Sequence, residues 1–155
     1  MKKRNHNFAK AIISFVILSI LIISVSSYFL FNKRLIGPVF IFLGFVSLLF
    51  FRFLKVDVQS AYSDIVFGAT DNFILVFAAI IGGTYAGVAG AIIGGVAGNT
   101  LSDGFAGLVE GRVVEKLKRK LDHKRTALST MLGKVTGCLF AAGIALTIIY
   151  LISLI

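Results

Sequence analysis

Oxygen-bearing side chains occur within and just after two of the most hydrophobic stretches of the chain. Asp71 lies in the first of these stretches, and Asn99 and Asp103 lie in the second, which Glu110 and Glu115 follow. Carboxylate and amide oxygens are ligands of hard or borderline divalent cations such as Mg²⁺, Mn²⁺ and Fe²⁺. We therefore identify these five residues as candidate metal ligands.

The spacing of these residues indicates how helices would position them. Asn99, Asp103 and Glu110 are four and seven residues apart, so they share one helix face. Asp71 follows Asp64 by seven residues, about 10 Å of helix, and a carboxylate at that membrane depth must face protein or water. If a hairpin joins the two stretches, Asp71 and Asn99 lie at similar depth, with Asp103 one turn nearer the cytoplasm. Asp71 and Asp103 are then both expected to face the interior of the helix assembly.

A structural interpretation competes with the functional one for each carboxylate. Polar residues are common near helix ends, where they act as caps or remain solvated. That interpretation is favoured for Asp64, and for Asp103 it is as well supported as ligation. For Asp71 the functional interpretation is favoured, because ionisable residues inside a membrane are functional candidates by default.

Other kinds of site are not indicated. The single cysteine, Cys138, lies in an apolar run and is expected to be a buried small residue. Because there is no Cys/His cluster, a zinc-finger-like site is excluded, and His123 is expected to be solvated. No nucleophile–base pair, nucleotide-binding loop or cofactor motif is present. We therefore expect no enzyme, and no cofactor beyond Fe²⁺ or Mn²⁺ as a transported ion.

The composition places these residues in a membrane protein. Hydrophobic residues make up 57% of the 155 residues, against about 45–50% in a soluble domain. The mean hydropathy is +0.95, and so short a chain cannot bury that much apolar surface by itself. The sequence predicts an all-α, polytopic membrane bundle that forms one domain over residues 1–155. Five transmembrane helices are expected, at about residues 11–31, 38–54, 64–82, 84–107 and 128–155.

The first hydrophobic run has two interpretations. Its basic start, its apolar core and the serines that follow resemble a signal peptide cleaved near residue 27. However, the apolar character continues to Phe31, which gives the roughly 20 residues needed to cross a bilayer. An uncleaved transmembrane helix is the favoured interpretation.

The distribution of Lys and Arg predicts the orientation. With five spans, 13 of these residues fall on the side of the N-terminus and two, Lys33 and Arg34, fall on the other. Positive residues collect on the cytoplasmic side, so we expect an integral protein of the cell or inner membrane with a cytoplasmic N-terminus and an external C-terminus. The same bias accounts for the net charge of +9, and no nucleic-acid partner is expected.

Residues 108–126 form a basic segment. Leu108, Val113, Leu117 and Leu121 recur on one side of a possible helix, and basic residues occupy much of the remainder. This pattern is typical of an amphipathic cytoplasmic helix that lies on an anionic inner leaflet of the bilayer. The alternative is a solvated charge run that only sets the topology.

Small residues recur every four positions in the fourth hydrophobic stretch. Such spacing lets a second helix backbone approach closely. The short Gly82-Gly83-Thr84 link predicts a tight helical hairpin, and we expect it to be the closest helix pair of the protein. Small-residue faces also predict a homo-oligomer, most simply a dimer. The candidate packing residues are Gly83, Gly87, Gly90, Gly94, Gly95 and Gly98.

Two short segments resemble the vacuolar iron transporter family. Residues 68–72 read Gly-Ala-Thr-Asp-Asn and lead into an Ala/Gly-rich helix, and residues 97–106 contain Asn99 and Asp103-Gly104 at the family's spacing from Asp71. The resemblance covers about 50 of the 155 residues. It implies divalent-metal transport and a metal-binding cytoplasmic region near Glu110 and Glu115. The chain departs from the family at Asn72, where glycine is usual, in the missing Ser-Met pair, and in its short, mainly basic charged region.

Two functions are therefore carried forward. The first is a transporter of divalent iron or manganese, or a reduced relative of one, with Asp71, Asn99 and Asp103 along the path. The second is a non-transporting glycine-zipper scaffold or assembly subunit of the membrane. A transporter requires the carboxylates, whereas a scaffold requires the glycines.

Overall fold

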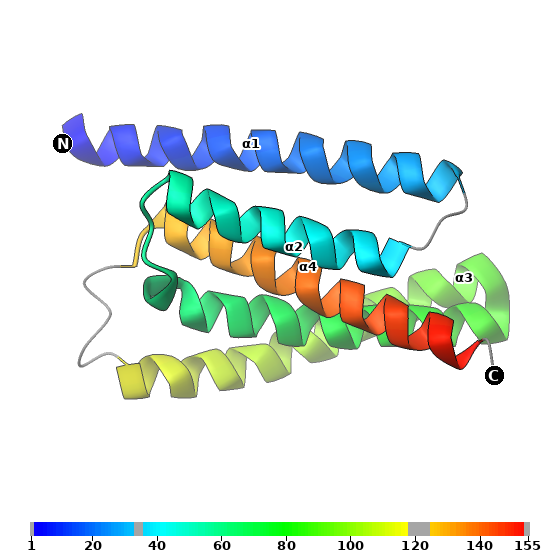
Figure 1. Ribbon diagram of the computed structural model, residues 1–155. Coiled ribbons are helices and arrows are strands. Elements are labelled where there is room, and N and C mark those ends of the chain that lie inside the picture. Colours follow the sequence, from blue (N-terminus) through cyan, green and yellow to red (C-terminus); the bar gives the residue numbers. More distant parts are fainter. Residues whose placement is uncertain (1, 33–35, 118–124, 154–155) are drawn as a thin grey trace.

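The chain is a bundle of long helices. The computed structural model describes residues 2–32, 36–117 and 125–153, with the side chains of all of these except 2–7, 106, 109–111 and 113–117. The elements are α1 (Lys2–Phe31), α2 (Ile36–Phe53), the 3₁₀ helix η1 (Val58–Ala61), α3 (Tyr62–Leu117) and α4 (Ala127–Ile152) (Figure 1). No strand occurs in the ranges that the structure describes. The four α-helices each contain a segment long and apolar enough to cross a membrane. The expectation of an all-α, multi-pass membrane protein is confirmed.

Helix α3 doubles back on itself at Ala86 and Gly87. Ala86 has φ −137° and ψ 25°, and Gly87 has φ 58°, a left-handed conformation that glycine adopts without steric cost. The predicted link at Gly82-Gly83-Thr84 was wrong, because these three residues are helical. Gly82 is needed for packing, whereas Gly87 permits the turn. We call residues 62–85 the first arm and residues 88–117 the second arm.

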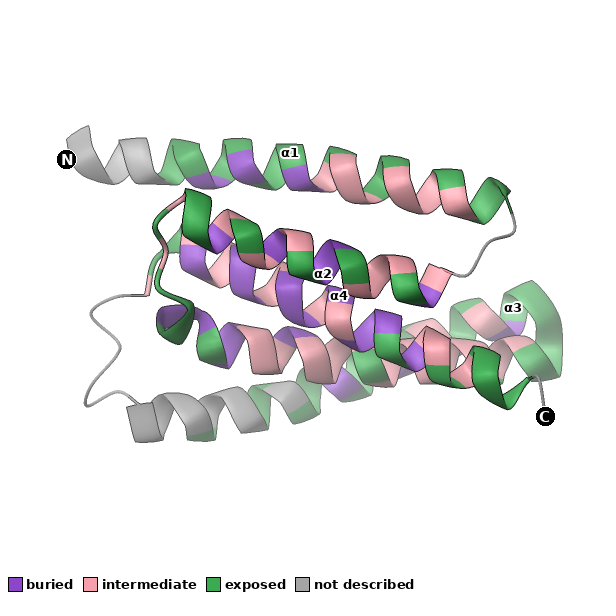
Figure 2. Cartoon of the chain, in the orientation of Figure 1, coloured by how far each residue is buried: buried purple, intermediate pink, exposed green. Residues whose placement is uncertain are grey.

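Helix α4 lies at the centre of the bundle and packs on both α2 and α3. Figure 2 shows it as the most buried helix, in contrast to α1 at the edge. It begins at a capping box: Ser129 N–H donates to the Thr126 hydroxyl at 3.1 Å, and Thr126 N–H donates to the Ser129 hydroxyl at 2.9 Å. A buried hydrogen bond of 2.6 Å joins Ser47 of α2 to Thr136 of α4. Helix α4 is in contact with α1, α2, α3 and η1.

The apolar core is concentrated at one end of the bundle. Leu18 of α1, Phe51 of α2, Ala61 of η1 and Leu132 of α4 are each at most 2% exposed and pack together. Most of the remaining apolar side chains of α1 are exposed, as expected where lipid replaces protein as the surrounding medium.

Several helix bounds differ from the predicted ones. The helix expected at 11–31 begins at Lys2, and the helix expected at 84–107 continues to Leu117. The polar linker before the third helix contains η1. The basic segment 108–126 therefore starts as a continuation of α3, because its apolar residues keep the helical period. Residues 118–124 lie outside the described part, so the proposed membrane-surface helix stays a prediction.

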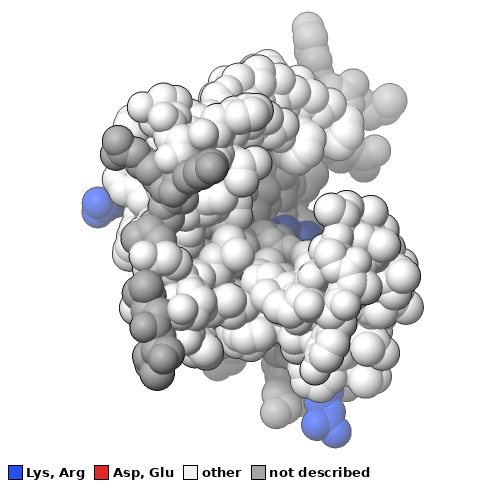
Figure 3. All heavy atoms as spheres, turned by 90° about the vertical axis from the view of Figure 1, so that its right-hand side faces the viewer, with Lys and Arg blue, Asp and Glu red and all other residues white. Residues whose placement is uncertain are grey.

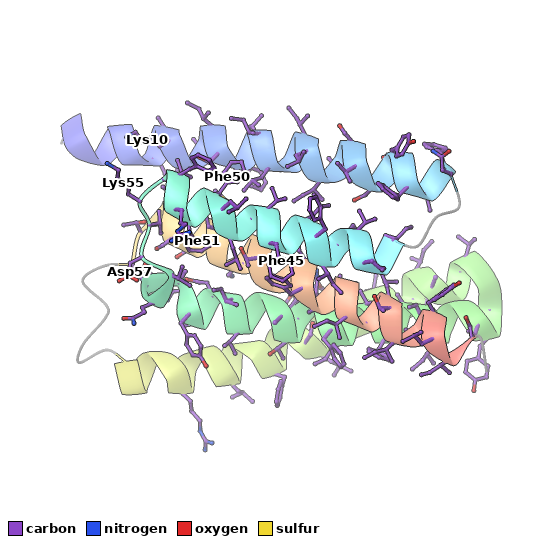
Figure 4. All side chains as sticks on the ribbon, in the orientation of Figure 1. Lys10, Phe45, Phe50, Phe51, Lys55 and Asp57 are labelled. Carbon is purple, nitrogen blue, oxygen red and sulfur yellow. The ribbon has the colours of Figure 1, made fainter. Side chains whose placement is uncertain are left out.

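Charge separates the two ends of the bundle. The labelled side chains Lys10, Lys55 and Asp57 lie at the end where α1 begins (Figure 4). The opposite end, seen in Figure 3, is largely white and shows no described Asp or Glu. The start of α1 and the end of α4 lie at these opposite ends (Figure 1).

Candidate cation site

Asp71 lies in the packed face between the two arms of α3. Its Oδ1 accepts a 2.5 Å hydrogen bond from the Ser102 hydroxyl, whose oxygen also lies 3.0 Å from the Asn99 carbonyl oxygen. Ser102 is 0% exposed and Asp71 is half-buried. One turn earlier, Gly98 lets the arms approach, since a Cβ there would lie 2.7 Å from the Ala78 Cβ. The hairpin therefore holds a carboxylate and a hydroxyl together inside the membrane-spanning region.

Asn99 and Asp103 face away from the first arm. Asn99 Nδ2 donates to Asp103 Oδ2 at 3.1 Å, and both residues are exposed. The expectation that Asp103 faces the interior was wrong for a single chain. Gly98 and Ser102 occupy the inward face, and the residue after each of them is rotated by about 100° on an α-helix. The prediction that Asn99 and Asp103 share one helix face is confirmed, and the prediction that this face points to the interior is wrong.

Glu110 and Glu115 continue along the second arm beyond Asp103. Their side chains lie outside the described part, so their role as ligands stays a prediction.

A cation from α4 reaches the first arm close to Asp71. Lys134 Nζ lies 3.9 Å from the centroid of the Phe67 ring, in a cation–π contact. Asn72, the residue after Asp71, joins the same arm to α4, because its Nδ2 donates to the Cys138 carbonyl oxygen at 3.1 Å. Lys134 lies near the start of the last predicted span, and its spacing there gives no sign of this contact. The contact could not be predicted, because the spacing of residues within one helix does not show that α4 packs against the first arm.

Asp64 is part of an ion pair that closes the end of the bundle. Arg125 Nη2 lies 2.5 Å from Asp64 Oδ1 and Nε lies 3.2 Å from Oδ2, so the pair is bidentate. Asp64 is 0% exposed and the Arg125 side chain 27%. Arg125 Nε also lies 3.3 Å from the Thr130 hydroxyl. The interpretation of Asp64 as a cap or solvated group was wrong. The ion pair joins Asp64, at the start of α3, to Arg125, just before α4.

The candidate packing glycines divide into three groups. Cβ atoms at Gly90 and Gly94 would overlap the carbonyl oxygens of Gly82 and Ala78, and Gly98 packs as closely as described above. Gly83 and Gly95 are at ordinary distances, 3.4 Å and 3.8 Å from the nearest Cβ. Gly87 forms the turn. Gly90, Gly94 and Gly98 therefore make the hairpin contact, and they leave little glycine surface there for a second chain.

Close glycine packing is not confined to the hairpin. A Cβ at Gly68 would overlap the Lys134 carbonyl oxygen, and a Cβ at Gly137 would overlap that of Ile65. Gly37 and Gly143 bring α2 and α4 together in the same way. The hairpin is thus one of several equally close pairs, and the sequence analysis missed the glycines of α4.

An open apolar groove of about 500 Å³ lies beside Asp71. The two arms and α4 form it, and its lining offers a cation no ligand except the Thr70 hydroxyl, which already donates to the Val66 carbonyl at 2.9 Å. The lining residues are Ala69, Thr70, Phe73, Ile74, Phe105, Phe140, Ala141 and Ile144.

A complete metal site is not formed by the described residues alone. Among them, no three His, Cys, Asp or Glu residues gather closely enough to hold a metal ion. Asp71 offers one carboxylate, with the Ser102 hydroxyl and the Asn99 carbonyl beside it. Hard cations such as Mg²⁺ commonly keep several water ligands and use one or two carboxylates. The geometry suits weak, partly hydrated binding better than a dedicated cage.

Comparison with known proteins adds no assignment to this geometry. No protein-family model matches the chain, and no curated protein and no solved structure matches it.

Proposed function

We propose that this membrane protein is a transporter of a divalent cation such as Fe²⁺ or Mn²⁺, or a reduced relative of one, with Asp71 as its central ligand. The observation that carries the proposal is a half-buried carboxylate at membrane depth that Ser102 holds between two helical arms. Intramembrane carboxylates are costly, and they commonly mark ion pathways.

The chemistry of the surrounding atoms supports a hard or borderline cation. The Asp71 carboxylate accepts one hydrogen bond from Ser102, although an ionised carboxylate has room for about four. A partly hydrated cation would satisfy the remaining lone pairs. In this proposal Asn99 and Asp103 form the next polar step, and Glu110 and Glu115 attract cations at the cytoplasmic mouth. The likeness to the vacuolar iron transporter family points to the same residues.

Lys134 sets a condition on binding. Its ammonium group lies on the ring of Phe67, one helical turn before Asp71, and like charges repel, so we expect it to weaken the binding of a divalent cation. A site of this kind binds weakly and releases its ion readily, which suits passage better than storage.

We further propose five membrane crossings with the N-terminus in the cytoplasm. In this proposal the two arms of α3 cross separately, and Lys10, Lys55 and Asp57 lie together at the end where α1 begins (Figure 4). A reporter domain fused after residue 155 should then be active only outside the cytoplasm. Activity of that fusion in the cytoplasm would contradict the five-crossing topology.

A non-transporting assembly subunit is the second candidate. The absence of a three-ligand cluster among the described side chains favours it. Its original basis, a free glycine face, is weakened because Gly90, Gly94 and Gly98 pack inside the hairpin. A subunit of this kind would need another face of the molecule.

Transport into liposomes separates the two candidates. Protein reconstituted with a metal-quenched dye inside the vesicles should pass Mn²⁺ or Fe²⁺, and Asp71→Asn should abolish the flux. Asp57→Asn is the matched control, because Asp57 is a carboxylate outside the hairpin that caps η1, accepting from Gln59 N–H at 3.0 Å. Equal flux through the native chain and Asp71→Asn, with both folded by thermal unfolding in detergent, would reject the transporter.

A further inference from the structure

The outward face of the second arm is not covered by any of the residues that the structure describes. Thr100, Asp103, Gly104 and Gly107 are all exposed on this arm. A Cβ added at Gly104 or Gly107 would meet nothing within 4 Å. Apart from the turn residue Gly87, every other described glycine has a neighbour within that distance. The first arm, by contrast, is covered by the second arm and by α4.

This face carries a polar pair within the membrane-spanning region. Asn99 and Asp103 lie in the apolar span that ends at Phe105. Asp103 also precedes Arg112 by nine residues, about 14 Å of helix. Their neighbour Ser102 contacts Asp71, which places the pair at nearly the same depth as the candidate cation site. A carboxylate that faces acyl chains at such depth is strongly disfavoured.

The pair is only partly satisfied by itself. Asp103 accepts one hydrogen bond, from Asn99, although its carboxylate has about four acceptor positions. Asn99 has two amide N–H donors, and one of them makes that bond. Acyl chains offer neither donors nor acceptors, so lipid cannot complete the pair.

We propose that a second copy of this chain covers the outward face of the second arm, in a parallel two-fold dimer where Asn99 of each copy donates to Asp103 of the other. A two-fold axis brings the same patch of both copies together, and this patch holds a free donor beside a free acceptor. It is therefore complementary to itself. Thr100, Gly104 and Gly107 supply the small side chains that allow two helix backbones to approach within reach of such short polar groups.

The inference does not depend on cation transport. The proposed function has Asp71, in the interior of the hairpin, as its central ligand and includes Asn99 and Asp103 only as a further polar step, whereas the interface needs only the outward face of the second arm. Loss of flux in Asp71→Asn with the dimer intact would support both proposals. A native dimer without any flux would reject only the transporter.

Disulfide trapping in native membranes tests the interface. In a Cys138→Ser background, Gly104→Cys and Gly107→Cys should form covalent dimers on mild oxidation, because two-fold related cysteines near the axis meet the distance limits of a disulfide. Phe42→Cys on α2 is the matched control, since Phe42 is 64% exposed on another helix. Dimers from Phe42→Cys, or none from both glycine positions, would overturn the proposed face.

A second measurement removes the polar pair. Asn99→Leu combined with Asp103→Leu keeps the exposed face apolar, so the monomer should fold while dimerisation in lipid weakens by about tenfold, as expected for two interhelical hydrogen bonds. Dimer fractions can be counted by single-molecule photobleaching as the protein is diluted into liposomes. Ile144→Ala, on the exposed side of α4, is the control. An unchanged dimer fraction in the double variant, or a native chain that is monomeric at every dilution, would overturn the inference.

Discussion

The two arms of α3 have similar composition but different surroundings. Both are apolar, both contain several small residues, and each carries a carboxylate near its middle. The first arm packs against the second arm and against α4, so Asp71 is half-buried and bonded across the hairpin. The second arm has protein on one side only, so Asp103 is exposed and bonded within its own helix. In a membrane bundle, the neighbouring helices that pack around a polar residue determine its role more than its spacing along the helix does.

The largest expected contrast is between two substitutions that each remove one negative charge, Asp64→Asn on the first arm and Asp103→Asn on the second. They should differ in how much they lower the free energy of unfolding. Asp64→Asn leaves the Arg125 guanidinium beside a neutral side chain, and residue 64 is fully buried. We expect a loss of about 3 kcal/mol in the free energy of unfolding, the low end for a broken buried pair, because Arg125 is partly exposed. Asp103→Asn keeps a hydrogen-bonding side chain on an exposed face and should change the free energy of unfolding little. Unfolding in mixed detergent micelles measures both, and equal losses would contradict the proposed difference in cover.

An intermediate effect is expected from enlarging one glycine on each face of the second arm. Gly94→Leu forces a side chain into the Ala78 carbonyl and should cost about 1–3 kcal/mol of folding free energy. Gly104→Leu enters open space and should leave the stability of the detergent-solubilised monomer nearly unchanged. Thermal unfolding of the two variants side by side tests this. If Gly104→Leu were as destabilising as Gly94→Leu, the outward face would not be free within one chain.

The smallest expected effect separates a structural hydroxyl from one that serves the candidate site. Ser102→Ala removes the donor to Asp71, and Ser47→Ala removes the buried bond to Thr136. Each should cost about 0.6 kcal/mol of stability, the average for an interhelical hydrogen bond in a membrane protein. Only Ser102→Ala should also reduce Mn²⁺ flux into liposomes. A parallel loss of flux in Ser47→Ala would show that stability alone accounts for the effect.

Helix existence and polar depth could be read from the sequence. The apolar runs are long enough to cross a bilayer, and a bilayer leaves helices as the natural structure for such runs, so the all-α membrane class followed directly. Counting residues predicted that Asp71 lies well inside an apolar helical span, and it does lie within the span Val58–Phe105. The turn of the hairpin was misplaced by three residues, because Gly82, Gly83 and Gly87 look alike in sequence and only packing distinguishes them.

The pairings between distant segments could not be read in the same way. Asp64 and Arg125 are 61 residues apart, and Asp71 and Ser102 are 31 apart. No periodic pattern links them. The central position of α4 likewise depends on Gly68, Gly133 and Gly137 meeting backbone from other helices, which a search for small residues within one helix does not reveal.

The sequence by itself determined that this chain has helices long and apolar enough to cross a membrane, that one hairpin is rich in glycine, and that carboxylates lie within an apolar span. These properties depend on hydropathy, residue type and helical rise, all of which are local. Only the tertiary structure decided which carboxylate is enclosed, which is ion-paired and which is left facing outward. The rotation and neighbours of each helix decide those outcomes, and they are set by close contacts between residues far apart in the chain.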